Sequence, residues 1–88
     1  MHKSQDILIK ELEKGYLKVK INGLYYHYKN PKNIYKVITL AITESNDSLS
    51  VIYEAQYGDK LIFVRPLISW LDKVEWNNKV TDRFTFIK

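Results

Sequence analysis

Two residues of this sequence, Arg65 and His27, have side chains suited to holding an anion. Arg65 precedes Pro66, and a proline biases the residue before it toward extended geometry, which would fix the direction of the guanidinium. A guanidinium can meet a phosphate or a carboxylate through two parallel hydrogen bonds. The alternative for Arg65 is an internal role, paired with loop carbonyl groups or with the carboxylate of Glu54, Asp59 or Asp72.

His27 stands between two tyrosines in the segment Tyr26-His27-Tyr28, which is predicted to be a strand. Side chains alternate along a strand, so the imidazole is expected on the face opposite Tyr26 and Tyr28. Near neutral pH it could donate to an anion or carry a proton. Because no carboxylate or nucleophile shares its motif, the alternative is a structural role. The other histidine, His2, is expected to be mobile.

Tyr25 and Tyr57 are aromatic candidates for the same site, because a flat ring can stack on a base or on a proline. The alternative is the core. Ordering a chain costs roughly 1.5 kcal/mol per residue, and aromatic side chains supply the largest buried areas. At least half of a set of five tyrosines is therefore expected inside: Tyr25, Tyr28, Tyr35, Tyr53 and Tyr57. Trp70 is expected to cover one end of the core, and Trp76 to be exposed.

No motif in the sequence indicates catalysis or a cofactor. There is no glycine-rich phosphate loop, no serine in an elbow motif and no convincing pair of carboxylates for acid and base work. With no cysteine and one internal histidine, His27, the chain offers no predicted metal site. We therefore expect no cofactor and no enzyme activity, although a site assembled from distant strands stays open.

The composition indicates one small domain in a reducing compartment. The 88 residues contain no Pro-, Gly- or Ser-rich divider, so a single core is expected. The absence of cysteine and of a long apolar segment predicts a cytoplasmic protein that is neither exported nor embedded in a membrane. A formal charge of +4 favours anionic partners, but the lysines are dispersed, so charge alone leaves nucleic-acid binding open.

Residues 1–15 are predicted to form an N-terminal helix. Ser4 can cap it, a spacing typical of a helix places three apolar residues on one face, and Gly15 can end it. From Tyr16 the apolar period changes to two, which predicts a strand over residues 16–21. Asn22-Gly23 then predicts a tight hairpin turn, because both residues tolerate positive φ. Residues 16–88 are expected to form the β-domain.

The rest of the chain predicts short antiparallel strands separated by polar turns. Strands are expected at residues 24–29, 34–43, 49–57, 61–64, 73–76 and 84–87, with turns at residues 30–33, 44–48, 58–60 and 77–79. Residues 67–71 are predicted to be a single helical turn, because Pro66 ends the strand before them. So many short strands in so few residues predict a mainly β fold, a small SH3-like barrel or roll.

Residues 23–88 resemble the family catalogued as domain of unknown function 1653, found mainly in bacteria and related mobile elements. The resemblance implies an SH3-like barrel or roll, and it brings no accepted activity, cofactor or catalytic residue. Its motifs, in order, are Gly23-Leu24-Tyr25-Tyr26-His27-Tyr28-Lys29, Tyr35-Lys36-Val37, Ala41 with Thr43-Glu44-Ser45, Val51-Ile52-Tyr53, Tyr57-Gly58, Phe63-Val64-Arg65-Pro66-Leu67 and Arg83-Phe84.

Three features depart from the pattern of that family. Tyr26 stands where the family usually has arginine, Gln56 stands where it usually has an apolar residue, and the turn at residues 30–33 is longer than its common glycine turn. If that arginine serves a ligand, the role is lost or altered in this chain.

These observations favour a non-catalytic binding module in which four residues line one groove and accept an anionic group, such as a nucleotide or a nucleic-acid backbone. One alternative is a protein-interaction adaptor that binds an extended peptide and docks a partner or a second copy through its helix. Another is a small enzyme or a nucleotide-sequestering protein. A monomer and a homodimer are both open. The four residues are Tyr25, His27, Tyr57 and Arg65.

Overall fold

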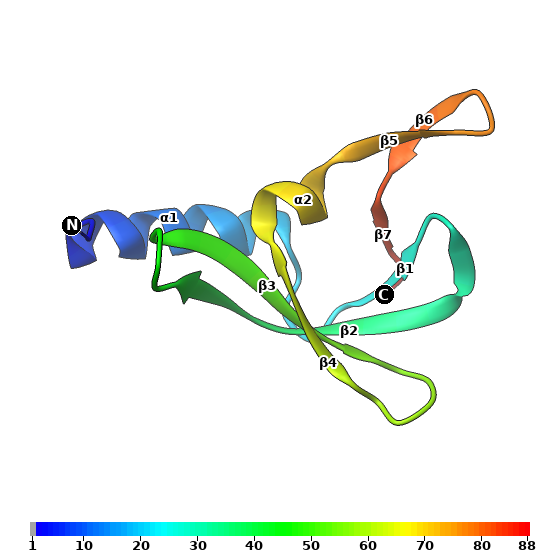
Figure 1. Ribbon diagram of the computed structural model, residues 1–88, viewed down its shortest axis with the longest axis horizontal. Helices are drawn as coiled ribbons and strands as arrows, with labels where there is room; N and C mark the ends of the chain where they lie inside the picture. The colour runs from blue at the N-terminus through cyan, green and yellow to red at the C-terminus, as the bar shows by residue number, and fades with distance from the viewer. Residues whose placement is uncertain (1) are drawn as a thin grey trace.

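The protein is mainly β, with antiparallel strands and one N-terminal helix (Figure 1). The computed structural model describes residues 2–88. The predicted fold class is confirmed. The elements in chain order are α1 (Gln5–Lys18), β1 (Leu24–His27), β2 (Asn30–Thr43), β3 (Ser48–Ala55), β4 (Ile62–Pro66), α2 (Leu67–Leu71), β5 (Lys73–Trp76), β6 (Lys79–Asp82) and β7 (Phe84–Phe86).

Helix α1 begins as predicted and ends later than predicted. The hydroxyl of Ser4 accepts a hydrogen bond from the backbone N–H of Ile7 at 3.3 Å, so Ser4 is the N-cap. The helix then continues to Lys18, and the N–H of Val19 donates to the carbonyl of Gly15. The predicted strand at residues 16–21 is therefore wrong, and Asn22-Gly23 joins a helix to a strand instead of forming a hairpin.

Close packing explains why the helix does not stop at Gly15. Gly15 is buried, and a Cβ built on it would meet Leu40 Cδ1 at 2.7 Å. The glycine thus lets α1 approach the sheet closely and does not end the helix. Leu12 and Val19 extend the same buried stripe at helical spacing. Leu17, in contrast, is 87% exposed, so the apparent period of two was misleading.

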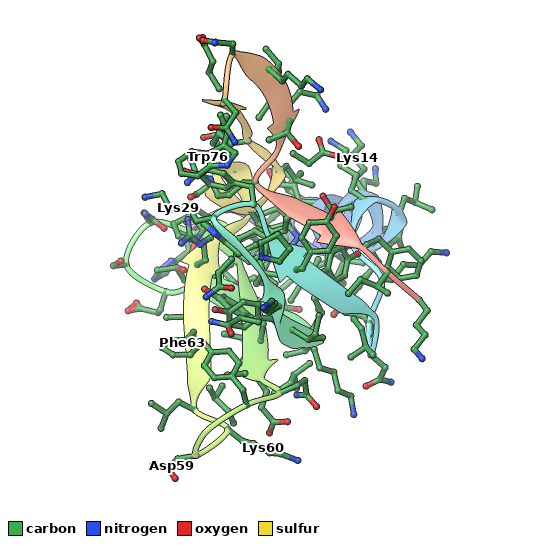
Figure 2. All side chains as sticks on the ribbon, turned by 90° about the vertical axis from the view of Figure 1, so that its right-hand side faces the viewer. Lys14, Lys29, Asp59, Lys60, Phe63 and Trp76 are labelled. Atoms are coloured by element: carbon green, nitrogen blue, oxygen red, sulfur yellow. The ribbon has the colours of Figure 1, made fainter. Side chains whose placement is uncertain are left out.

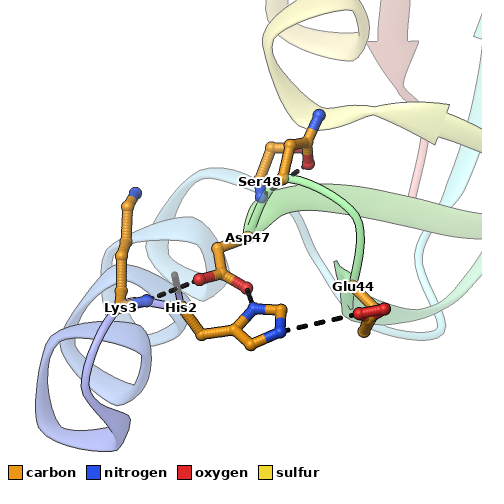
Figure 3. A network of polar contacts seen from close by, with 6 residues as sticks. His2, Lys3, Glu44, Asp47 and Ser48 are labelled. Atoms are coloured by element: carbon orange, nitrogen blue, oxygen red, sulfur yellow. Dashed lines mark hydrogen bonds and ion pairs between the residues drawn. The ribbon is translucent and has the colours of Figure 1, made fainter.

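The start of the described chain is held against the loop between β2 and β3 (Figure 3). His2 Nδ1 lies 2.7 Å from Asp47 Oδ1, and the backbone N–H of Lys3 donates to the same carboxylate. These bonds lower the pKa of Asp47, the Lys3 N–H contributing most. Glu44 lies 3.6 Å from the other ring nitrogen of His2. His2 therefore has two carboxylates of this loop beside its ring.

The hairpin between β1 and β2 turns at Tyr28 and Lys29, earlier than predicted. His27 pairs with Asn30, and the strand β2 includes all of the predicted turn at residues 30–33, so that turn is wrong. The register shifts between Tyr26 and His27, and this bulge leaves Pro31 and its neighbours without partners on β1. A proline is tolerated at such a place because it has no N–H to give to the ladder.

Five strands form one bent sheet in the order β4-β3-β2-β1-β7. The long strand β2 pairs with β1 along its first half and with β3 along most of its length, and a second bulge between Val37 and Thr39 bends it. The sheet has two edges, so among the described residues it is open and not a closed barrel, an arrangement compatible with an SH3-like roll (Figure 1).

The core lies between the bent sheet, α1 and α2. Trp70, on the predicted helical turn α2, is 3% exposed and covers one end of the core as expected. The buried apolar cluster consists of Val19, Tyr25, Val37, Leu40, Val51, Tyr53, Trp70 and Phe84.

A second, two-stranded sheet is formed by the hairpin of β5 and β6, which projects away from α1 (Figure 1). Its turn is at Asn77 and Asn78, whose φ angles of 53° and 65° are the left-handed values that a tight hairpin requires. This turn was predicted. In residues 2–88 we find no helix that combines the length and the apolar character needed to span a membrane.

Candidate anion-binding surface

The register of the sheet places two of the predicted site residues on one face. Residues paired across neighbouring strands point to the same side, and alternate residues along a strand do too. His27 on β1 pairs with Phe84 on β7, and Arg65 on β4 pairs with Val51 on β3, a residue of the buried core. The side chains of His27 and Arg65 therefore belong to the inner face of the sheet, together with Phe84.

Phe84 is the ring around which these side chains gather. The imidazole of His27 lies 5.0 Å from it, centroid to centroid, with the planes at 77°. The guanidinium carbon of Arg65 lies 5.3 Å from the Phe84 centroid. A cation near the face of an aromatic ring is attracted by its quadrupole. The contact therefore orients Arg65 without removing its charge.

The guanidinium of Arg65 keeps most of its donors for another molecule. Its Nη1 donates to the hydroxyl of Ser69 at 2.9 Å. Within residues 2–88 no ion pair joins it to a carboxylate. The internal partners considered from the sequence, Glu54, Asp59 and Asp72, are thus not used by Arg65.

His27 sits among three cationic side chains. Its pKa lies below the ordinary value of 6.5, first because the ring is partly buried and then because Arg65, Arg83 and Lys29 lie nearby. The Nδ1 atom accepts a hydrogen bond from the backbone N–H of Lys29 at 3.3 Å. The neutral ring therefore carries its proton on Nε2, which leaves an N–H donor for a ligand.

Arg83 is a partly enclosed cation of this cluster. Its side chain is 24% exposed, and Nη2 lies 3.8 Å from Asp72 Oδ2. The Nε atom is buried and has no hydrogen-bond partner within residues 2–88. His27 and the cations Arg65, Arg83 and Lys29 thus influence one another electrostatically, and among them Arg83 contacts a carboxylate, that of Asp72. An anion would relieve their mutual repulsion.

A run of aromatic rings leads from this cluster to the surface. The ring of Tyr28 lies 4.6 Å from His27 and 5.3 Å from Trp76. Tyr28 belongs to the hairpin turn, so its ring lies beside His27 and not on the opposite face as predicted. Trp76 is 42% exposed, as expected. We call the rings of Phe84, His27, Tyr28 and Trp76 the aromatic run.

The outer end of the aromatic run lines an open groove of about 370 Å³. Lys29 adds a positive charge there, with its ammonium 5.9 Å from the centroid of Tyr28. Figure 2 shows Trp76 and Lys29 on the side of the molecule away from α1. The groove is lined by Tyr26, Tyr28, Pro31, Trp76, Asn77, Lys79 and Thr81. Its rings and Lys79, with Lys29 beside Tyr28, suit a ligand that has both flat and anionic parts.

The structure gives the other two predicted site residues different roles. Tyr25 is 5% exposed, and its hydroxyl accepts a hydrogen bond from the backbone N–H of Lys20 at 2.9 Å. Tyr57 is 41% exposed, and its hydroxyl lies 2.8 Å from that of Tyr35. Burial and this hydrogen bond raise the pKa of Tyr35 to about 12. Tyr25 therefore packs in the core, and Tyr57 supports Tyr35.

Sequence reasoning missed Lys29, Arg83 and Phe84 as members of the site. All three stand in motifs that resemble the family, so the sequence contained a signal for them. Nothing in the neighbouring sequence, however, distinguished them from ordinary surface or core residues. The residues described, 2–88, contain no cluster of three or more metal-ligating side chains.

The fold and the site together define a small, mainly β domain with an open basic and aromatic surface. Residues 23–86 match the family model described as "Protein of unknown function (DUF1653)". The chain belongs to this family. A search of curated proteins gave no match.

One solved structure supports the same assignment. It is a crystal structure of a DUF1653 protein from Bordetella bronchiseptica, which is similar to this chain with a TM-score of 0.68 and 25% sequence identity. The similarity covers 80% of this chain and 90% of the other. The expected family and the mainly β, antiparallel fold are therefore confirmed, and the arrangement is compatible with an SH3-like roll.

Proposed function

We propose that this protein is a non-catalytic binding module for a single-stranded nucleic acid or a nucleotide. The observation that carries the proposal is the placement of Arg65, Arg83 and Lys29 around His27, at the inner end of a run of rings that reaches the surface at Trp76. Phosphate groups would be held by the cations, and bases would stack on the exposed rings.

The charges favour a polyanion over a neutral ligand. Three cations lie around His27, and in residues 2–88 one of them, Arg83, contacts a carboxylate, that of Asp72. Bound phosphate would pair with Arg65 and Lys29, and it would accept a hydrogen bond from Nε2 of His27. Each of these contacts is available without breaking the bond from Arg65 to Ser69.

An extended peptide is the second candidate, and the groove beside Pro31 favours it. Its aromatic lining, with Tyr26, Tyr28 and Trp76, is also what proline-rich segments bind. Such a ligand is neutral, so its affinity would depend little on salt. We also propose that the protein works in the cytoplasm, since a small domain without cysteine suits a reducing compartment.

Salt dependence separates these ligands. A fluorescently labelled single-stranded oligonucleotide is titrated with the protein, and anisotropy is read at low and at moderate salt. We expect the logarithm of the affinity to fall by about 0.7 for each phosphate contacted, per logarithmic unit of salt. Affinity that does not change with salt, or no binding at millimolar protein, would overturn the proposal. A proline-rich peptide titrated in the same way tests the second candidate.

A further inference from the structure

Strand β4 is an edge of the five-stranded sheet and carries an uninterrupted apolar segment. Four consecutive residues are exposed, one just before the strand and three within it: Leu61 at 61%, Ile62 at 60%, Phe63 at 40% and Val64 at 65%. Natural proteins protect such edges with charges, prolines or bulges, because an open apolar edge pairs with other strands. This edge has no charge between Lys60 and Arg65 and no register shift along its pairing with β3.

The backbone of this edge is free at two positions. The N–H of Ala55 donates to the carbonyl of Leu61 at 2.9 Å, which makes these two a hydrogen-bonded pair. Hydrogen-bonded pairs alternate along an antiparallel ladder, so Phe63 and Arg65 also bond to β3. The N–H and C=O groups of Ile62 and Val64 therefore point away from the sheet. The backbone of Pro66 also points away from the sheet, but a proline has no N–H to donate.

We propose that β4 pairs antiparallel with β4 of a second copy of this chain, so that the two sheets become one. With the two-fold axis at Phe63, Ile62 of each copy faces Val64 of the other. Each of these pairs would exchange two backbone hydrogen bonds, because both residues point their backbone groups outward.

The side chains suit this register. Phe63 would face its own equivalent, and Leu61 would face Arg65 of the other copy along the aliphatic part of its side chain. Lys60 would face Pro66, so like charges are not opposed. The same surface serves both copies, as a two-fold interface requires. A second copy is the occupant we infer because the edge is complementary to itself in both hydrogen bonds and apolar contacts.

The interface is short, so we expect a dimer that forms in the micromolar to millimolar range. The test is sedimentation equilibrium of the full chain over that range. Val64→Pro removes an outward N–H that β3 does not use, and Val64→Lys places a charge on the edge. Each variant should weaken the dimer by about tenfold or more.

The control is Val80→Lys, which makes the same change at a residue 71% exposed on β6. It should dimerise as the unmodified chain does, and circular dichroism verifies that each variant is folded. A monomer throughout the range would overturn the inference. So would a dimer that persists unchanged in both Val64 variants.

Discussion

The rings of Trp70 and Phe84 stack face to face, with centroids 3.8 Å apart and planes 5° from parallel. Trp70 comes from α2 and Phe84 from β7, and both are buried. The pair joins two elements that are distant in sequence. It also fixes the ring against which His27 and Arg65 lie. The binding surface therefore depends on the same contact that closes one end of the core.

Phe84→Leu should weaken both the fold and the site. Phe84 meets several rings, and aromatic pairs contribute roughly 0.5–1.5 kcal/mol each beyond their buried area. We expect the free energy of unfolding in urea to fall by about 1–2 kcal/mol. Phe86→Leu is the matched control, since Phe86 is 47% exposed, and it should cost less than about 0.5 kcal/mol. Equal losses in the two variants would contradict the central role of Phe84.

Gly15→Leu should destabilise the protein although leucine is the better helix former. The new side chain would collide with Leu40, and overpacking costs roughly 1–3 kcal/mol. The control Glu13→Leu adds the same side chain at an exposed helical position and should change the free energy of unfolding by less than about 0.5 kcal/mol. Urea unfolding measures both. A Gly15→Leu variant as stable as the control would refute the close helix packing.

The sequence predicted those elements whose signals are local. The turn at Asn77 and Asn78, the helical turn around Trp70 and the central strands all depend on nearby residues, and they are present. The end of α1 was missed because glycine is both a helix terminator and a packing residue. Only the position of Leu40, distant in sequence, distinguishes the two roles.

The site was predicted only in part for a similar reason. His27 and Arg65 have recognisable chemistry, and the sheet register brings both to Phe84. Tyr25 instead packs in the core, and its hydroxyl accepts a hydrogen bond from the N–H of Lys20, just after α1 ends at Lys18. Tyr28 and Lys29 lie beside His27 because they form the hairpin turn, which the sequence had predicted later, at the polar residues 30–33.

Stability should fall as the pH drops below about 6.5, through His27. Its pKa in the folded protein lies below its ordinary value of 6.5, mainly because of burial. As the pH falls, the unfolded chain therefore binds the proton before the folded protein does. The loss of stability reaches its full size only below the pKa that His27 has in the folded protein. The measurement is thermal unfolding of the unmodified chain and of His27→Gln between about pH 7.5 and about pH 5, a range that brackets the ordinary histidine pKa. The two chains should differ in slope; parallel curves would contradict the prediction.

Lys29→Gln should weaken oligonucleotide binding and reduce its salt dependence. Removing one phosphate contact lowers the slope of log affinity against log salt by about 0.7. Lys10→Gln makes the same change in charge at an exposed position of α1, away from the aromatic run. Anisotropy titrations of both variants are compared. The prediction fails if the two variants lose the same affinity, because that would indicate an effect of net charge alone.

Trp76→Ala should cost more affinity than the loss of an equally exposed ring elsewhere. A base stacked on an aromatic side chain is worth roughly 1–3 kcal/mol, or about 5-fold to 150-fold in affinity. Tyr16→Ala is the control, since Tyr16 on α1 is 41% exposed and Trp76 is 42% exposed. Anisotropy at one salt concentration is sufficient. An equal effect of both substitutions would remove Trp76 from the site.

The most direct measurement is a two-dimensional NMR titration of the ¹⁵N-labelled protein with a single-stranded oligonucleotide. The indole N–H of Trp76 and the backbone amides of residues 27–29 and 83–84 should shift together, while those of α1 stay in place. Shifts confined to other parts of the chain, or no shift at millimolar ligand, would contradict the assignment of the basic and aromatic surface as the binding site.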